Sequence, residues 1–349
     1  MRLASSAEAE QGHAVWYHQD ASLVAAGVWT ERRAGAGEDA EPLLMHHRPT
    51  GTGLIAVFDG SGGSGAAIAH ESVDGTPRTG AWVGSRVARA TSETWFAETA
   101  AAHGHDYHGH DGDAAALGDR MARSMSVMRP TRPTRLIGRI RRELPTTMAA
   151  LRYRRRGGTV RCRALWAGDS RAYLLTPGAG LQALTRDHTD ETDALDQLLQ
   201  DPPMTNVICA DRPFRIDQAD TEARLPCVLV CATDGFFGYV DTPAHFECHL
   251  LRELSDARDA ADWADLLRAR VTGYTADDAS LSLVAVGYRD FEHLRGAFSR
   301  RTDDVLRAHW PDGPRLTEPE FRSWRSRSWH EYRPGYERLM PPAPDGGRR

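Results

Sequence analysis

The fold class of this chain is decided by one stretch, Leu54-Ile55-Ala56-Val57-Phe58-Asp59-Gly60-Ser61-Gly62-Gly63. Its first five residues are apolar and predict a buried strand, which ends abruptly in Asp59. A glycine-rich turn follows, where the backbone is free to come close to an ion or a phosphate. We therefore expect a carboxylate at the end of a buried strand, beside a site that binds a charged group.

Acidic residues mark the ends of three more apolar runs. They are Asp169 in the run that begins at residue 164, Asp234 after the run that begins at residue 228, and Asp277 with Asp278 before residues 281–286. Carboxylate oxygens are the ligands that hard cations such as Mg²⁺ and Mn²⁺ prefer. Two such ions together can activate a water for in-line displacement at phosphorus. The recurring strand-end acids therefore indicate a hard-metal centre.

Four acids suit such a centre, because each lies close to an apolar run and can reach one edge of a pair of packed sheets. They are Asp39, Asp59, Asp234 and Asp277, with the main-chain carbonyl of Gly60 as a further ligand. Any one Asp-Gly pair is more often a plain turn. The prediction therefore depends on the whole set and on its order along the chain.

The bulk composition is that of an ordinary globular protein. Of its 349 residues, 41% are hydrophobic and 26% are charged, which suffices for one large domain or two modest ones. The net charge of −5 argues against nucleic acid as a partner.

The first residues lack the apolar segment of a signal peptide, and no run is long enough to cross a membrane. We expect a cytoplasmic protein without a membrane partner, whose five cysteines are buried and reduced.

The sequence pattern predicts more strands than helices, with the helices in pairs. Expected strands are 22–29, 54–58, 146–153, 160–167, 171–176, 228–232 and 281–286. Expected helices are 86–101, 114–127, 189–200, 244–254, 260–271 and 291–310. A turn at 177–180 suggests that 160–167 and 171–176 pair as a hairpin. This grouping favours an α+β fold of packed layers over a regular βαβ alternation.

The strand-end acids belong to a longer series of motifs. In chain order the series is Glu38-Asp39, Phe58-Asp59-Gly60-Ser61-Gly62-Gly63, Pro145-Thr146-Thr147-Met148-Ala149, Gly168-Asp169-Ser170-Arg171-Ala172-Tyr173, Leu184-Thr185-Arg186-Asp187-His188, Thr233-Asp234-Gly235 and Asp277-Asp278-Ala279-Ser280. It resembles the motif series of the metal-dependent Ser/Thr protein phosphatases, the PPM or type 2C family. The matches cover residues 22–288, a span suited to one such domain.

The resemblance implies a four-layer α-β-β-α sandwich of two mainly antiparallel sheets flanked by paired helices. It implies two Mg²⁺ or Mn²⁺ ions in a cleft at one end, and hydrolysis of phosphoserine and phosphothreonine in proteins by a water that the metals activate. By the same resemblance Asp59 bridges both ions, Asp234 and Asp277 hold one, and Asp39 contacts the other through water. Phosphorylated proteins are the implied substrates, and a cognate Ser/Thr kinase is a candidate partner.

Three positions depart from the family pattern. Ser61 replaces a histidine thought to protonate the leaving alkoxide, which serine does poorly because its pKa is far higher. Gly238 lies where many members have an acid that supports a third metal ion, so only Asp169 and Asp234 remain for that site. Asp278 replaces an asparagine, and its added charge would tighten metal binding or raise the pKa of a neighbouring acid.

Two basic residues have open interpretations. The family's phosphate-binding arginine is matched best by Arg33, six residues before Asp39, with Arg32 beside it. A solvated surface arginine is an equally open interpretation of Arg33. His188 is not an obvious substitute for the histidine missing at Ser61, because its place in the motif favours a structural role.

The chain divides into two expected parts. We predict a phosphatase domain over residues 12–290 and an extension over residues 291–349 that begins as a helix, is rich in Trp and Arg, and ends in disorder. Residues 103–110 contain four histidines and predict a polar surface loop, with a transition-metal site as the alternative. Residues 129–142 are basic and predict a solvated segment, or a docking site for an acidic partner.

Three functions remain open from the sequence. The leading one is a metal-dependent protein phosphatase acting on phosphoserine and phosphothreonine. The second is a weakly active or inactive module with the same fold, which binds phosphoproteins or regulates a partner kinase; Ser61 and Gly238 motivate it. The third is hydrolysis of a small phosphorylated metabolite, which keeps the metal ligands and changes the pocket.

Overall fold

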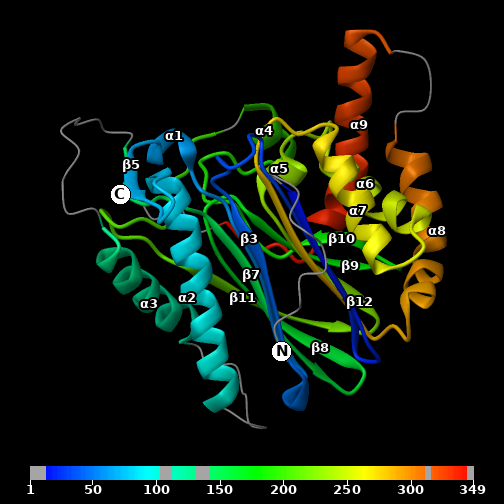
Figure 1. Cartoon of the computed structure of the whole chain (residues 1–349). Helices are drawn as coiled ribbons and strands as arrows, with labels where there is room; N and C mark the ends of the chain where they lie inside the picture. The colour runs from blue at the N-terminus through cyan, green and yellow to red at the C-terminus, as the bar shows by residue number, and fades with distance from the viewer. Residues whose placement is uncertain (1–12, 103–111, 130–140, 201, 311–315, 344–349) are drawn as a thin grey trace.

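The computed structural model describes residues 13–102, 112–129, 141–200, 202–310 and 316–343. Two antiparallel sheets pack face to face, and helices cover both outer faces (Figure 1). The predicted α+β class and the four-layer α-β-β-α sandwich are therefore confirmed. The expected His-rich loop at residues 103–110, most of the basic segment and the last six residues lie outside the described residues.

The first sheet has the strand order β1-β2-β13-β12-β9-β10. Its strands are β1 (His13–Gln19), β2 (Leu23–Thr30), β9 (Arg171–Thr176), β10 (Gly180–Ala183), β12 (Cys227–Ala232) and β13 (Ala279–Val286). The central strands β12 and β13 are buried along their whole length. Because helices cover one face of this sheet and the second sheet covers the other, these strands are mostly continuous apolar runs.

The second sheet has the order β11-β8-β7-β4-β3. Its strands are β3 (Ala40–His47), β4 (Thr52–Phe58), β7 (Met148–Arg156), β8 (Thr159–Ala167) and β11 (Asp217–Arg224). The edge strand β11 carries exposed charged side chains that alternate with less exposed ones. Charged side chains on an edge discourage pairing with another chain.

Short elements connect the sheets and helices. A separate hairpin consists of β5 (Ile68–Glu71) and β6 (Pro77–Thr79). The short helices are η1 (Arg48–Thr50), α1 (Gly62–Gly65), α4 (Ala194–Gln200) and α5 (Asp234–Phe237). Of the helix predicted over residues 189–200, only the last seven residues are helical.

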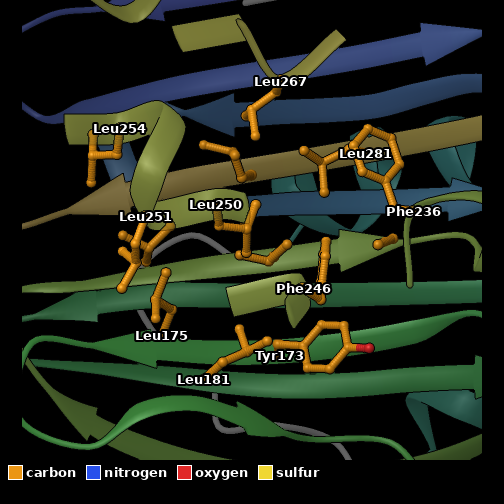
Figure 2. Close-up of a cluster of buried hydrophobic side chains, with 14 of the residues drawn as sticks. Tyr173, Leu175, Leu181, Phe236, Phe246, Leu250, Leu251, Leu254, Leu267 and Leu281 are labelled. Carbon is orange, nitrogen blue, oxygen red and sulfur yellow. The ribbon is translucent and has the colours of Figure 1, made fainter. Parts of the chain in front are cut away.

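Apolar side chains fill the space between the layers. Ile55, Leu151, Leu229 and Val284 are among those buried between the two sheets. The helices α2 (Gly80–Ala102) and α3 (Asp113–Val127) cover the second sheet, and α6 (Pro243–Asp256) and α7 (Ala260–Thr272) cover the first. Figure 2 shows the cluster on the first sheet, where leucines of α6 and α7 meet Tyr173, Leu175, Leu181 and Leu281. All five cysteines are buried and free, as the sequence predicts.

The hairpin predicted between residues 160–167 and 171–176 is wrong. β8 pairs with β7 in the second sheet, whereas β9 pairs with β12 and β10 in the first. Gly168 lies between them with a φ of 97° and carries the chain from one sheet to the other. A Cβ atom on Gly168 would lie 2.5 Å from the Cβ of Thr147, so only glycine fits this crossing.

The C-terminal helices share a core with the first sheet. α8 (Phe291–His309) confirms the helix predicted over residues 291–310, and α9 (Glu318–Tyr336) follows it. Phe298, Trp329 and Tyr336 are buried in the same apolar cluster as α6 and the first sheet. The predicted boundary after residue 290 stays a prediction. Within the described ranges, no helix has the length and the apolar character needed to cross a membrane.

Glu247 of α6 joins these helices through buried polar contacts. Its carboxylate is fully buried and accepts hydrogen bonds from Arg301 Nε of α8 at 2.6 Å and Tyr332 Oη of α9 at 2.6 Å. The main-chain N–H of Leu181 in β10 donates to the same carboxylate at 3.1 Å. One carboxylate therefore fixes two C-terminal helices and a strand to α6.

We predict that Glu247→Gln lowers the free energy of unfolding by about 3 kcal/mol, because it leaves Arg301 without its buried counter-ion. Urea unfolding followed by circular dichroism measures this. The matched control is Asp304→Asn, which removes an exposed ion pair with Arg307 on α8 and should leave the midpoint unchanged. Equal midpoints for Glu247→Gln and the wild type would contradict the structural role of this carboxylate.

Candidate active site

Antiparallel pairing of the strands brings four strand ends, each next to an aspartate, to one end of the sandwich. In the second sheet Ala40 of β3 is paired with Phe58 of β4, so the residues next to them, Asp39 and Asp59, are neighbours. In the first sheet the end of β12 lies beside the start of β13, with Asp234 following the first strand and Asp277 preceding the second. Hydrogen bonds from Thr233 and Ser280 to residues 39 and 40 then join the two sheets.

Asp39 and Asp59 form a coupled carboxyl pair. Asp39 is 2% exposed, and Asp59 is partly buried. Each of the two carboxyl groups shifts the pKa of the other, and Thr233 Oγ1 donates to Asp39 Oδ2 at 2.9 Å. Burial and then the nearby charges of Asp278 and Asp234 raise the pKa of Asp39 well above its usual range.

The pKa of Asp59 shows how closely the acids gather. Burial, followed by the charges of Asp39, Asp169 and Asp277, raises this pKa well above its usual range. The pKa of Asp277 is also raised, chiefly by burial. Each carboxylate therefore disfavours ionisation of its neighbours, and a bound cation would relieve that repulsion.

Asp278 holds the turn that leads into β3. Its two carboxylate oxygens accept the main-chain N–H groups of Arg32 at 2.7 Å and Glu38 at 2.6 Å. After burial, its charge is the largest contribution that raises the pKa of Asp39. The residue in the asparagine position thus fixes the backbone before Asp39 and adds negative charge beside the coupled pair.

Close packing of the backbone requires glycine after Asp59 and after Asp234. A Cβ atom on Gly60 would lie 2.5 Å from the carbonyl oxygen of Glu38, and one on Gly235 would lie 2.0 Å from that of Asp278. The carbonyl of Asp59 accepts hydrogen bonds from the main-chain N–H of Thr147 and from Thr146 Oγ1. Among the described residues no hydrogen bond is formed to the carbonyl of Gly60, which is itself a buried residue.

A cleft of about 370 Å³ lies beside these acids. Asp169, Asp234 and Asp277 line it, and its other walls include Arg171, Asp187, Gln197, Phe237 and Tyr239. The hydroxyl of Tyr239 lies 3.5 Å from Asp277 Oδ2. Burial and the charge of Asp277 raise the pKa of Tyr239 to about 12, so this side chain is a neutral hydrogen-bond partner in the cleft.

The acids suit a divalent cation by their chemistry. The atoms available to a metal ion are the carboxylate oxygens and the carbonyl oxygen of Gly60. Oxygen ligands of this kind are the ones that Mg²⁺ and Mn²⁺ prefer. Within the described ranges, no three His, Cys, Asp or Glu side chains are already gathered around one point as metal ligands. Asp39, Asp59, Asp234 and Asp277 are the residues that would hold such a cation.

Ser61 presents a hydroxyl at the position of the missing histidine. Its Oγ is buried and has no hydrogen-bond partner among the described residues. Its main chain bonds instead, with the N–H donating to Pro145 and the carbonyl accepting from Gly65. The side chain thus plays no part in holding the turn.

The two candidate arginines differ in their surroundings. Arg32 and Arg33 both lie in the exposed turn before Asp39. The charge of Arg32 lowers the pKa values of Asp277 and Tyr239, against the stronger upward effect of burial on both. The carbonyl of Arg33 accepts the N–H of Ala36 within the turn. Arg33 therefore stays a prediction, and Arg32 is the neighbour that acts on the acids.

His188 has the structural position that its motif predicts. It is 5% exposed, and its Nδ1 accepts the N–H of Gly168 at 3.0 Å and that of Asn206 Nδ2 at 3.0 Å. Its Nε2 must then carry the proton that bonds to Asp217 Oδ2 at 2.9 Å. The ring of His188 therefore fixes the crossing at Gly168 and is held by Asn206 and Asp217.

Sequence reasoning missed two side chains at this site. Thr233 bonds to Asp39, and its place before Asp234 in the motif was the available signal. Glu38 accepts a hydrogen bond from Thr79 Oγ1, and burial followed by the charge of Asp278 raises its pKa. Glu38 and Asp278 together extend the carboxylate cluster beyond the predicted ligands.

Comparison with known proteins identifies the fold. No protein-family model matches the chain, and no curated protein matches it. The serine/threonine phosphatase Stp1 from Staphylococcus aureus superposes with a TM-score of 0.51 and 17% identity, over 77% of this chain and 98% of its own. The PPM Ser-Thr phosphatase MsPP from Mycobacterium smegmatis, solved with cacodylate, gives 0.52 and 16% identity, over 77% of this chain and 100% of its own. The resemblance to the PPM family is thus confirmed at the level of the fold.

The coupled acids predict a pH-dependent stability. Because the folded pKa values of Asp39 and Asp59 are raised, their contribution to stability is present below the ordinary carboxyl pKa of about 4. It is lost as pH rises through the raised values. We predict that the Tm of the metal-free protein falls between about pH 5 and about pH 8, and that Mn²⁺ raises Tm more at the higher pH, where the carboxylates can ionise.

Differential scanning fluorimetry of EDTA-treated protein checks this prediction. Asp39→Asn should flatten the pH dependence, because it removes one of the coupled acids. Asp265→Asn, at an exposed position on α7, should leave it unchanged. A Tm of the metal-free protein that rises over the same range would show that these carboxylates are ionised without a cation.

Proposed function

We propose that this protein is a metal-dependent phosphatase that removes phosphate from phosphoserine and phosphothreonine in proteins. The observation that carries the proposal is the coupled carboxyl pair of Asp39 and Asp59 beside a cleft lined by Asp234 and Asp277. Gathering these acids at one end of the sandwich is electrostatically unfavourable, because burial and then their charges raise the pKa values of Asp39 and Asp59. Because the chain shares its fold with protein phosphatases, metal binding for phosphate hydrolysis explains why these acids are gathered here.

The proposed ligands are Asp39, Asp59, Asp234, Asp277 and the carbonyl of Gly60, with Asp169 in reach of a third ion. Two bound Mg²⁺ or Mn²⁺ ions would supply an activated water and would neutralise charge during displacement at phosphorus. The chain itself orients the ligands, since Thr233 bonds to Asp39 and the carbonyl of Asp59 is held by Thr146 and Thr147. Arg33, or Arg32 beside it, would bind the phosphate.

Substrates of this activity would be phosphorylated proteins, with a cognate Ser/Thr kinase as a further candidate partner. Ser61 supports the alternative of a weakly active module that binds phosphoproteins or regulates such a kinase. Its buried hydroxyl cannot protonate an alkoxide near neutral pH as a histidine would. The retained carboxylates favour the active enzyme, because a module that had lost metal binding would not need them.

We predict that the purified protein releases phosphate from a phosphothreonine peptide in the presence of Mn²⁺. Asp59→Asn should lower the rate by at least about 100-fold, because it removes the central ligand. Malachite-green detection of phosphate measures this, with Asp265→Asn as the matched control. Equal rates for Asp59→Asn and the wild type would refute the assignment, and release only from small phosphorylated metabolites would favour the third function.

We predict that Ser61→His speeds phosphothreonine hydrolysis by at least about tenfold, because the alkoxide leaving group needs a proton. Hydrolysis of p-nitrophenyl phosphate should change less than about twofold, since its leaving group departs unprotonated. A pH–rate profile of each variant measures both effects. Ser61→Asn is the control, as it adds bulk without a group that titrates near neutrality. A similar gain from Ser61→Asn would show that Ser61 does not replace a proton donor.

A further inference from the structure

The C-terminal helix α9 reaches the wall of the acid cleft. In Figure 1 it runs beside α6 and projects beyond the sandwich. Its buried face carries Trp329, Tyr332 and Tyr336, at spacings of three and four residues that place them on one side of a helix. Two of these three side chains contact residues that form or support the cleft, and the third contacts Glu247.

Tyr336 contacts the central residue of the cleft wall, Arg171. The guanidinium of Arg171 is 4% exposed and makes a two-pronged ion pair with Asp187, with Nη2 2.7 Å from Oδ2 and Nε 3.0 Å from Oδ1. It also donates to Gln197 Oε1 at 2.8 Å and to Tyr336 Oη at 3.3 Å. The ring of Phe237, three residues after Asp234, lies 4.3 Å from its centre. Arg171 thus links α9 to three other residues around the cleft, Asp187, Gln197 and Phe237.

Trp329 contacts the segment before α4, and this segment and α4 together contribute Thr189, Gln197 and Leu198 to the lining of the cleft. Its indole N–H donates to both carboxylate oxygens of Asp193, at 3.0 and 3.1 Å, and Arg333 forms an ion pair with the same carboxylate. Asp193 also accepts the N–H groups of Leu195 and Asp196 at the start of α4. Asp193 is therefore the point where α9 contacts the start of α4.

The residues after α9 continue the contact. The carbonyl of Pro341 accepts a hydrogen bond from Arg186 Nε at 2.8 Å. Arg338 donates to Gln182 Oε1 at 3.2 Å, and Gln182 donates to the carbonyl of Gly335 at 3.4 Å. Residues 335–341 therefore lie along residues 182–186, which lead directly into Asp187 and the cleft wall.

We propose that α9 is a positioning element of the active site, which holds residues 187–200 in the conformation that receives the substrate. Trp329 and Tyr336 are its positioning residues, and they act through Asp193 and Arg171. The proposal rests on the proposed phosphatase function for its catalytic consequence, but not for the structural coupling. Without α9, Arg171 would lose its contact with Tyr336, and Asp193 would lose its contacts with Trp329 and Arg333.

Tyr332 provides a matched comparison on the same helix. Its hydroxyl donates to Glu247, which belongs to the junction of α6, α8 and β10 and does not line the cleft. Removing this hydroxyl weakens the packing of α9 without touching Arg171 or Asp193. A purely structural role of α9 would therefore make Tyr332 and Tyr336 equivalent, whereas a positioning role separates them.

The test compares Trp329→Phe/Tyr336→Phe with Tyr332→Phe in the full chain. We expect the double variant to raise KM for a phosphothreonine peptide about fivefold, which corresponds to the loss of one or two hydrogen bonds. Its KM for p-nitrophenyl phosphate should change less than twofold, because this substrate occupies only the acid end of the cleft. Tyr332→Phe should lower Tm and leave both KM values unchanged.

Hydrogen exchange gives a readout that does not need activity. Amides of residues 187–200 should exchange about fivefold faster in the double variant than in the wild type and in Tyr332→Phe. This holds even if the wild type shows no phosphatase activity, so failure of the proposed function is distinguishable. Unchanged exchange and unchanged KM in the double variant would overturn the proposal. If the double variant does not fold, Tyr336→Phe alone carries the same comparison, with exchange equal to that of Tyr332→Phe as the overturning result.

Discussion

The burial of two carboxyl groups against each other is the constraint on which the active-site end of this protein depends. Asp39 and Asp59 stand at strand ends that the pairing of β3 with β4 makes adjacent, and Thr233 of the other sheet bonds to the same pair. Like charges removed from water repel, so either a shared proton or a cation must hold them. The raised pKa values describe the state with a shared proton, and the proposed metal centre is the state with bound cations.

The surrounding structure supports that pair from several directions. Asp278 fixes the turn before Asp39, glycines allow the backbones to pass closely at Gly60 and Gly235, and His188 fixes the crossing at Gly168. These groups act through backbone contacts, so they set where the acids lie without occupying the cleft. In our proposal, α9 extends the same support to residues 187–200. Residues far apart in sequence therefore determine one local geometry, which is the reason that the whole sandwich is needed for the site.

Most of the fold and the set of acids could be predicted from the sequence, because continuous apolar runs that end in Asp identify buried strands and their ends. Edge strands such as β11 were missed because their polar alternation resembles a loop. The crossing at Gly168 was misread as part of a hairpin, since strand partners depend on long-range packing. The helix α9 was also missed, although Trp329, Tyr332 and Tyr336 have helical spacing and Thr317 with Glu320 forms a capping box. The orientation of Asp277 toward Tyr239 depends on tertiary contacts that no local pattern encodes.

The central claim is that the coupled acids form a centre for two divalent cations. The most direct measurement is anomalous diffraction at the manganese edge from crystals soaked in millimolar Mn²⁺ at about pH 8, where the carboxylates can ionise. We predict two manganese peaks beside Asp59, with Asp39, Asp234 and Asp277 turned toward them, and none in Asp59→Asn crystals. Absence of manganese at Asp59 in wild-type crystals would contradict it.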